Sequence, residues 1–227
     1  MSKQGQYAWS NPGQNPNFGG TDFPSGIEER CLKEVAQRVA RNGMIGFDLG
    51  CHLGWTASKV IPVFMQHNGH FHLVDWCCGN VNTRVNNLWW QNEYPSKELL
   101  LQLLSNVECQ GFKGVTVTVG TTLDLASTVA DRSCDYIYIG GDHRYSKIKA
   151  DLEAWLPKIR SGGVVIGHGW DGYVDLAAIP KEEWNSIWAG EELDFYSQFG
   201  VHLGINRAVT ELLPNYQSQG NLWYSFR

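Results

Sequence analysis

Two acidic residues and one histidine occupy positions from which they could bind and activate a small molecule. Asp48 lies in an apolar segment just before Gly50 and Gly54. A carboxylate beside bare backbone can hold a cationic or zwitterionic ligand at close range, and glycine also permits a positive φ. Asp75 closes the next apolar segment, where a carboxylate can accept hydrogen bonds from both ribose hydroxyls of a nucleoside. His143 follows a later segment, and a histidine there can serve as a base near neutral pH.

The apolar patterns around these residues predict strands that alternate with helices. Residues 44–49 predict a strand and residues 55–64 a helix, with the glycines between them. Strand, glycine loop and helix form the usual opening of a nucleotide-binding α/β domain. The remaining predicted strands are 69–76, 115–119, 135–139, 164–166 and 221–227, and the remaining predicted helices are 27–41, 95–104, 123–129, 146–159, 181–199 and 204–213.

This alternation predicts a Rossmann-like α/β fold, with a doubly wound, mostly parallel sheet between two layers of helices. The final strand, 221–227, is expected to lie antiparallel at one edge of the sheet. Residues 23–227 should form a single domain, preceded by a flexible arm at 1–22 and carrying a lid-like insertion around 173–200. Ligands of such sheets bind at the carboxyl ends of the strands, so the three side chains above should face one site.

Length and charge narrow the class of protein. The 227 residues can bury a full core, and a formal net charge of −5 disfavours a nucleic-acid partner. No apolar stretch is long enough to span a bilayer, and the polar N-terminus does not resemble a signal peptide. A cytoplasmic protein with mostly buried, free thiols is therefore expected. The six cysteines are at positions 31, 51, 77, 78, 109 and 134.

The spacing Asp48-x-Gly50-x-x-x-Gly54 lacks the full G-x-G-x-x-G of dinucleotide-binding proteins. It resembles motif I of the class I S-adenosylmethionine (SAM) dependent methyltransferases. More narrowly, the chain from about Ile27 onward resembles the macrolide- and aminocoumarin-sugar O-methyltransferase family. The segments that carry this resemblance are 47–50 with Gly54, 135–145, 151–155, 162–168 and 207–211.

The resemblance implies a cofactor site built from three loops. The glycine loop would surround the methionine part of SAM with main-chain amides and an acid. The acid after the second strand would hold the ribose, and the loop after the third strand would lie near the adenine. The residues expected to bind SAM are Asp48, Gly50, Cys51, Gly54, Asp75, Trp76, Gly120 and Thr121.

The resemblance also implies methyl transfer to a hydroxyl of a small molecule, such as a sugar or natural product. His143 would remove the proton from the acceptor hydroxyl, oriented by Asp142 or Asp171. The protein must also align the acceptor with the methyl group. The alternative for His143 is a hydrogen-bonded structural histidine at the end of a strand.

Two departures from the family concern its magnesium site. Relatives carry aspartate where this chain has Gly140 and Gly169, and glycine has no side chain to bind a hard cation. Asp142, His168 and Asp171 lie nearby but are only weak candidates for metal ligands. No catalytic divalent metal is therefore expected, and aspartates at both glycines are expected to create metal binding.

Two other functions remain open at this point. An NAD-dependent oxidoreductase would also use Asp75 for a ribose, although the glycine pattern is incomplete. A non-catalytic SAM-binding protein would bind the cofactor without turnover. The sequence does not determine whether the chain forms a homo-oligomer.

Overall fold

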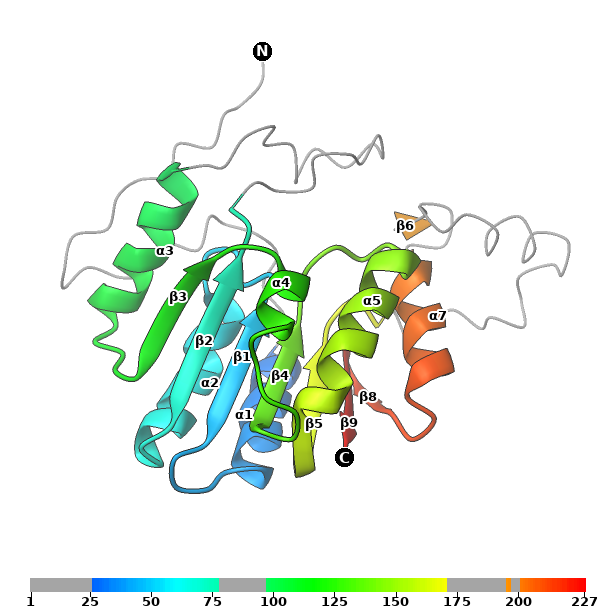
Figure 1. Cartoon of the computed structure of the whole chain (residues 1–227), viewed down its shortest axis with the longest axis horizontal. Helices are drawn as coiled ribbons and strands as arrows, with labels where there is room; N and C mark the ends of the chain where they lie inside the picture. The colour runs from blue at the N-terminus through cyan, green and yellow to red at the C-terminus, as the bar shows by residue number, and fades with distance from the viewer. Residues whose placement is uncertain (1–25, 78–96, 171–194, 197–200) are drawn as a thin grey trace, which may run out of the picture.

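The computed structural model describes residues 26–77, 97–170, 195–196 and 201–227. Figure 1 shows a twisted central sheet with helices on both faces. The predicted arm at 1–22 and most of the predicted lid around 173–200 lie outside the described residues.

The main sheet has seven strands in the order β3-β2-β1-β4-β5-β9-β8. The first five strands in sequence pair in parallel, and β9 pairs antiparallel with both β5 and β8. The predicted Rossmann-like fold with an antiparallel C-terminal strand is confirmed, and the short β8 extends the sheet beyond that strand. The strands are β1 (Ile45–Leu49), β2 (His70–Asp75), β3 (Val115–Val119), β4 (Cys134–Ile139), β5 (Ile159–Gly167), β8 (Gln217–Gln219) and β9 (Leu222–Phe226).

Helices cover both faces of this sheet and bury one apolar cluster on each face. Successive side chains of a strand point to opposite faces, so Tyr136 and Tyr138 join the cluster with α1 and α2, whereas Ile137 and Ile139 join the cluster with α5 and α7. All six residues of β4 are buried, as expected for a central parallel strand. The helices are α1 (Gly26–Arg38), α2 (Trp55–Gln66), α3 (Lys97–Cys109), α4 (Thr122–Ala126), α5 (Tyr145–Trp155) and α7 (Leu203–Leu212).

The structure differs from the sequence prediction mainly in short elements. Residues 161–163, predicted as a turn before a strand, lie inside β5, where an irregularity separates the Cys134–Ile159 pair from the Tyr136–Val164 pair. Residues 195–196, predicted as helix, form β6, which pairs with β7 (Val201–His202). β6 and β7 are two residues long each, too short to produce a recognisable alternation in the sequence.

Two further expectations can be compared with the described residues. No helix among them is long and apolar enough to cross a membrane. All five cysteines in this part of the chain are free thiols, and four of them are buried. The free and mostly buried thiols predicted from the sequence are therefore confirmed for Cys31, Cys51, Cys77, Cys109 and Cys134.

Candidate functional site

The carboxyl ends of neighbouring strands bring most of the predicted site residues together. The parallel strands run toward the same edge of the sheet (Figure 1), where the loops after β1 and β4 touch. A Cβ atom on Gly50 would lie 2.6 Å from the Cα atom of Gly141, so only glycine permits this approach. On the other side, the Gly120 amide donates to the carbonyl of Asp75 at 3.1 Å. The predicted loops thus lie next to one another at one edge of the sheet.

Asp48 lies beneath the glycine loop as an isolated buried acid. Asp48 is 1% exposed, and no side chain of the described residues donates a hydrogen bond to its carboxylate oxygens; the Ala57 backbone amide lies near them but outside normal hydrogen-bond geometry. Burial, and then the charge of Asp75, raises the pKa of Asp48 to about 8, while the Ala57 backbone amide opposes the shift. A buried carboxylate without a partner is costly, which indicates a place prepared for a cation.

The glycine loop differs from the prediction in how its amides are used. The amides of Gly50 and Cys51 both donate to the Val74 carbonyl, at 2.8 and 3.2 Å. The His52 amide donates to the Asp75 carboxylate at 2.7 Å. These three groups therefore maintain the fold of the loop, and the predicted amide contacts with a ligand have to come from elsewhere.

The start of α2 offers such contacts. Gly54 is the N-cap residue, with a φ of +78° and no side-chain cap. A Cβ atom there would also lie 3.0 Å from Leu103, so a larger residue would be both strained and crowded. A helix N-terminus attracts anions, and a carboxylate could bind at this one. Asp48 can bind a cationic group and the N-terminus of α2 can bind an anionic group. Together they suit a zwitterionic ligand.

Asp75 connects two loops of the site. One carboxylate oxygen accepts the His52 amide, and the other accepts the Cys77 amide at 2.6 Å. Each carboxylate oxygen can accept a second hydrogen bond. Asp75 can therefore hold the backbone in place and still accept hydrogen bonds from a ribose.

Apolar side chains near Asp75 provide a surface for a flat ring. Trp76 is 56% exposed, Val119 is 53% exposed and Leu123 is 46% exposed. Val119 is the register partner of Asp75 in β3, and Leu123 lies in the first turn of α4. Sequence reasoning missed Val119 and Leu123, although an apolar residue at a strand end before Gly120 could have indicated them. Exposed apolar surface beside a polar site is typical of ligand binding.

Thr121 has a structural role in the same loop. Its hydroxyl accepts a hydrogen bond from the Asp124 amide at 3.1 Å and donates one to the Asp124 carboxylate at 2.6 Å. This is an N-cap for α4. The Thr121 side chain is therefore occupied by the cap, and any adenine contact at this position would come from the backbone.

Three histidines cluster where β4 and β5 end and α7 begins. Nδ1 of His143 lies 3.2 Å from Nδ1 of His202, and the rings of His143 and His168 are 4.7 Å apart. The Tyr138 hydroxyl lies 3.0 Å from Nδ1 of His168. Tyr138 is also the register partner of Asp48 in the neighbouring strand. Sequence reasoning missed His202, which carries no local motif.

Two histidines of this cluster, His143 and His168, are held in the neutral form. Burial lowers the pKa of His143 well below its usual range, and the neighbouring His168 and His202 lower it further. Burial and His202 lower the pKa of His168 to about 4. Both imidazoles are therefore uncharged at neutral pH, as a general base must be before it accepts a proton.

Asp142 is bound by Arg144. The Arg144 side chain donates to both Asp142 oxygens, with Nε distances of 3.0 and 2.9 Å, and the Arg144 backbone amide donates at 3.1 Å. In the described part of the chain, His202 and His168 lie beside the His143 imidazole. The orienting role of Asp142 stays a prediction. The other predicted partner, Asp171, lies outside the described residues.

The two glycines at which the resemblance to the sugar O-methyltransferases implies metal-binding aspartates face occupied space. A Cβ atom on Gly140 would lie 2.8 Å from the Tyr138 ring and 3.4 Å from His168. Gly169 has a φ of +79°, and its Cβ atom would lie 2.3 Å from Ile205. In the described part of the chain, no three His, Cys, Asp or Glu side chains are arranged to hold a metal ion. These residues therefore do not fit the family's magnesium site.

The crowding at Gly140 and Gly169 makes lower stability, and not new metal binding, the result that we expect from the two aspartates. Gly140→Asp and Gly169→Asp should each lower the free energy of unfolding by roughly 1–3 kcal/mol, because of overpacking and, at Gly169, backbone strain. Urea unfolding measures this loss, and calorimetry with Mg²⁺ should detect no binding. The matched control is Gly26→Asp, where a Cβ atom meets nothing within 4 Å. A double variant as stable as the parent that binds one Mg²⁺ would contradict this prediction.

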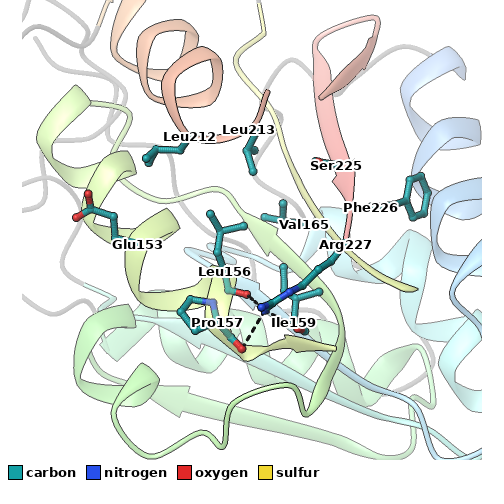
Figure 2. A pocket seen from close by; sticks show the side chains of 10 residues that line it. All are labelled: Glu153, Leu156, Pro157, Ile159, Val165, Leu212, Leu213, Ser225, Phe226 and Arg227. Carbon is teal, nitrogen blue, oxygen red and sulfur yellow. Dashed lines mark hydrogen bonds between the residues drawn. The ribbon is translucent and has the colours of Figure 1, made fainter. Parts of the chain in front are cut away.

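A separate cavity of about 450 Å³ lies at the other end of the sheet (Figure 2). It is bordered by the start of β5 and the end of α7, where the Arg227 guanidinium donates to the carbonyls of Leu156 and Pro157. None of the residues predicted to form the functional site lines this cavity. The lining residues are Glu153, Leu156, Pro157, Ile159, Val165, Leu212, Leu213, Ser225, Phe226 and Arg227.

Comparison with known proteins agrees with the geometry. A family model described as a methyltransferase domain matches residues 47–170 of this chain. The matched region begins in β1 and extends just beyond β5, so it contains the glycine loop, Asp75 and His143.

Solved structures share the fold at low sequence identity. A putative O-methyltransferase from Klebsiella pneumoniae has a TM-score of 0.59 and 11% identity, covering 91% of this chain and 82% of that protein. A putative caffeoyl-CoA O-methyltransferase from Staphylococcus aureus has a TM-score of 0.57 and 14% identity, covering 90% of this chain and 85% of that protein. Cofactor-bound Rv0187 from MTB has a TM-score of 0.58 and 13% identity, covering 91% of this chain and 82% of that protein.

One curated relative matches over a shorter region. The uncharacterized protein y4gI of Sinorhizobium fredii is 32% identical over 69 residues, which is 26% of this chain. The match spans only 8% of the length of that protein.

Proposed function

Because the chain belongs to the methyltransferase-domain family, we propose that it methylates a hydroxyl oxygen of a small molecule with His143 as the general base. Its cofactor is S-adenosylmethionine. The observation that carries the proposal is the contact between Gly50 and Gly141. This contact brings the His143 loop against the loop that would hold the methionine part of the cofactor.

The residues at the carboxyl edge fit this cofactor. Asp48 would compensate the positive charge of the ammonium or sulfonium group, and the start of α2 would bind the carboxylate. Asp75 would accept the ribose hydroxyls, and the exposed side chains of Trp76 and Val119 would pack on the adenine. Each part of a zwitterionic nucleoside thus has a matching group in the described residues.

The chain's own chemical task is to align an acceptor and to remove one proton. Bound SAM supplies an already activated methyl group on a sulfonium. A hydroxyl oxygen becomes a good nucleophile only as its proton leaves, and in this proposal His143 takes that proton. Because its lowered pKa keeps the imidazole neutral, His143 is ready to act without prior deprotonation.

The class of acceptor rests on two kinds of support. Two of the structures that share the fold are described as O-methyltransferases, which favours an oxygen acceptor. The net charge of −5 favours a small molecule over a nucleic acid. A sugar or natural-product hydroxyl, a cytoplasmic location and a homo-oligomer remain predictions.

Family membership also bears on the rival functions. A methyltransferase domain removes the argument for an NAD-dependent oxidoreductase. A non-catalytic SAM-binding protein remains the second candidate, because glycines replace the family's metal-binding acids at Gly140 and Gly169. Calorimetry with SAM, S-adenosylhomocysteine and NAD tests cofactor identity. Release of S-adenosylhomocysteine with a panel of sugars and phenols tests turnover.

Removing the carboxylate of Asp75 should weaken cofactor binding. Asp75→Ala is expected to cost roughly 1–3 kcal/mol of SAM binding, because the ribose loses a charged acceptor and the His52 amide loses its partner. Calorimetry measures the affinity, and circular dichroism checks that the fold is intact. Asp131→Asn, on the surface beside Lys158, serves as a control. Unchanged SAM affinity in a folded Asp75→Ala protein would remove Asp75 from the site.

A further inference from the structure

His202 reaches the catalytic loop from a distant part of the chain. It is the N-cap residue of α7, and α7 packs against α5 immediately after the His143 loop. Its imidazole meets His143 nearly edge to face, with ring centroids 4.5 Å apart and an interplanar angle of 87°. The two Nδ1 atoms lie at hydrogen-bonding distance, 3.2 Å.

Two glycines make this approach feasible. A Cβ atom on Gly204 would lie 2.3 Å from the His143 carbonyl oxygen and 2.5 Å from the Tyr145 amide. A Cβ atom on Gly169 would collide with Ile205 and would lie 3.4 Å from the His202 ring. At Gly204 the neighbouring atoms belong to the backbone, so any side chain there would push the start of α7 away from His143. At Gly169 a side chain would require Ile205 to move. The close packing at Gly204 therefore maintains the contact between the two histidines.

From this packing we infer that His202 is a positioning residue that accepts a hydrogen bond from Nδ1–H of His143 and so fixes the catalytic tautomer. The inference rests on the proposed function, since a base needs a lone pair on the nitrogen that takes the proton. A neutral imidazole carries one proton. If Nδ1 of His143 donates to His202, the lone pair must be on Nε2. Holding the correct tautomer is how the third residue of a catalytic triad acts.

Polar groups surround the two rings. They are His168, the Tyr138 phenol that lies at hydrogen-bonding distance from it, and Asp142, which pairs with Arg144. The N-terminus of α7 adds a partial positive charge at His202. In this setting an imidazole nitrogen of His202 takes the place of the usual orienting carboxylate.

Nitrogen NMR of the histidine rings tests the tautomer directly, because a protonated ring nitrogen and one with a lone pair resonate far apart. In the native protein at pH 7, His143 should carry its proton on Nδ1. His202→Asn places an amide oxygen near the former Nδ1 and should preserve this tautomer, whereas His202→Leu should lose it. His143→Gln identifies the His143 signals, and His67→Leu at the end of α2 is the control.

Several results would overturn the inference. They are a native His143 protonated on Nε2, an unchanged tautomer in His202→Leu, or a Zn²⁺ ion that binds stoichiometrically and shifts both rings. Once an acceptor is found, His202→Leu should lower kcat by about 10–100-fold at unchanged SAM affinity, and His202→Asn should restore most of it. The tautomer measurement needs neither SAM nor acceptor. Failure of SAM binding or turnover in the native protein would reject the proposed function and leave the tautomer result interpretable.

Discussion

Replacing His143 with alanine is expected to lower kcat for methyl transfer by about 10²–10⁴-fold while SAM affinity stays nearly constant. The imidazole takes the acceptor proton, whereas the cofactor is held by other loops, chiefly through Asp48 and Asp75. Release of S-adenosylhomocysteine measures turnover, and calorimetry measures affinity. His143→Asn should be equally inactive, because it keeps a polar group beside His202 but has no basic nitrogen. A decrease of only a few-fold would reject His143 as the base.

The pH profile should reflect the environment of His143. Because the pKa of His143 lies below the ordinary value of about 6.5, kcat/KM should stay constant as pH falls through 6.5 and decline only at lower pH.

The stability of the folded protein should also change in this acidic pH range. In the unfolded chain, His143 and His168 bind protons below about pH 6.5, whereas in the folded protein both resist protonation. The free energy of unfolding should therefore decrease as pH falls below about 6.5, and the contribution of His168 to this decrease should end near pH 4. Activity at low pH should therefore be compared with the fraction folded.

Replacing Asp48 with asparagine should change stability and cofactor affinity in opposite directions. SAM affinity is expected to fall roughly 10–100-fold, because the buried charge that compensates the cofactor's positive charge is lost. The cofactor-free protein should gain about 1–3 kcal/mol in its free energy of unfolding, because an isolated buried carboxylate is removed. Urea unfolding without SAM and calorimetry with SAM measure the two effects.

The size of this gain in stability should depend on pH in a defined way. The folded protein keeps a proton on Asp48 up to about pH 8, whereas the unfolded chain loses it near pH 4. The protonated acid thus favours folding at low pH, and that contribution is lost as pH rises toward 8. The advantage of Asp48→Asn should be small near pH 4 and largest above pH 8, with Asp131→Asn as the surface control. A variant less stable than the parent at pH 8, or with unchanged SAM affinity, would contradict the role of Asp48.

The sequence by itself determined the order of the main strands and helices, because period-2 and helical apolar patterns are local properties. The same patterns placed Asp48, Asp75 and His143 after successive strands. In a parallel sheet those strand ends share one edge, so the common site followed from the topology. Motif spacing also predicted the methyltransferase family, which the family match confirms.

Only the tertiary structure decided how these residues are used. The pairing of His143 with His202, 59 residues apart, depends on α7 packing against the loop after β4. The isolation of Asp48 and the internal bonding of the loop amides depend on which donors reach each acceptor in three dimensions. At Gly140 and Gly169 the sequence showed that two acids were missing. The structure showed that Tyr138 and Ile205 fill the space, because distant elements pack there at close range.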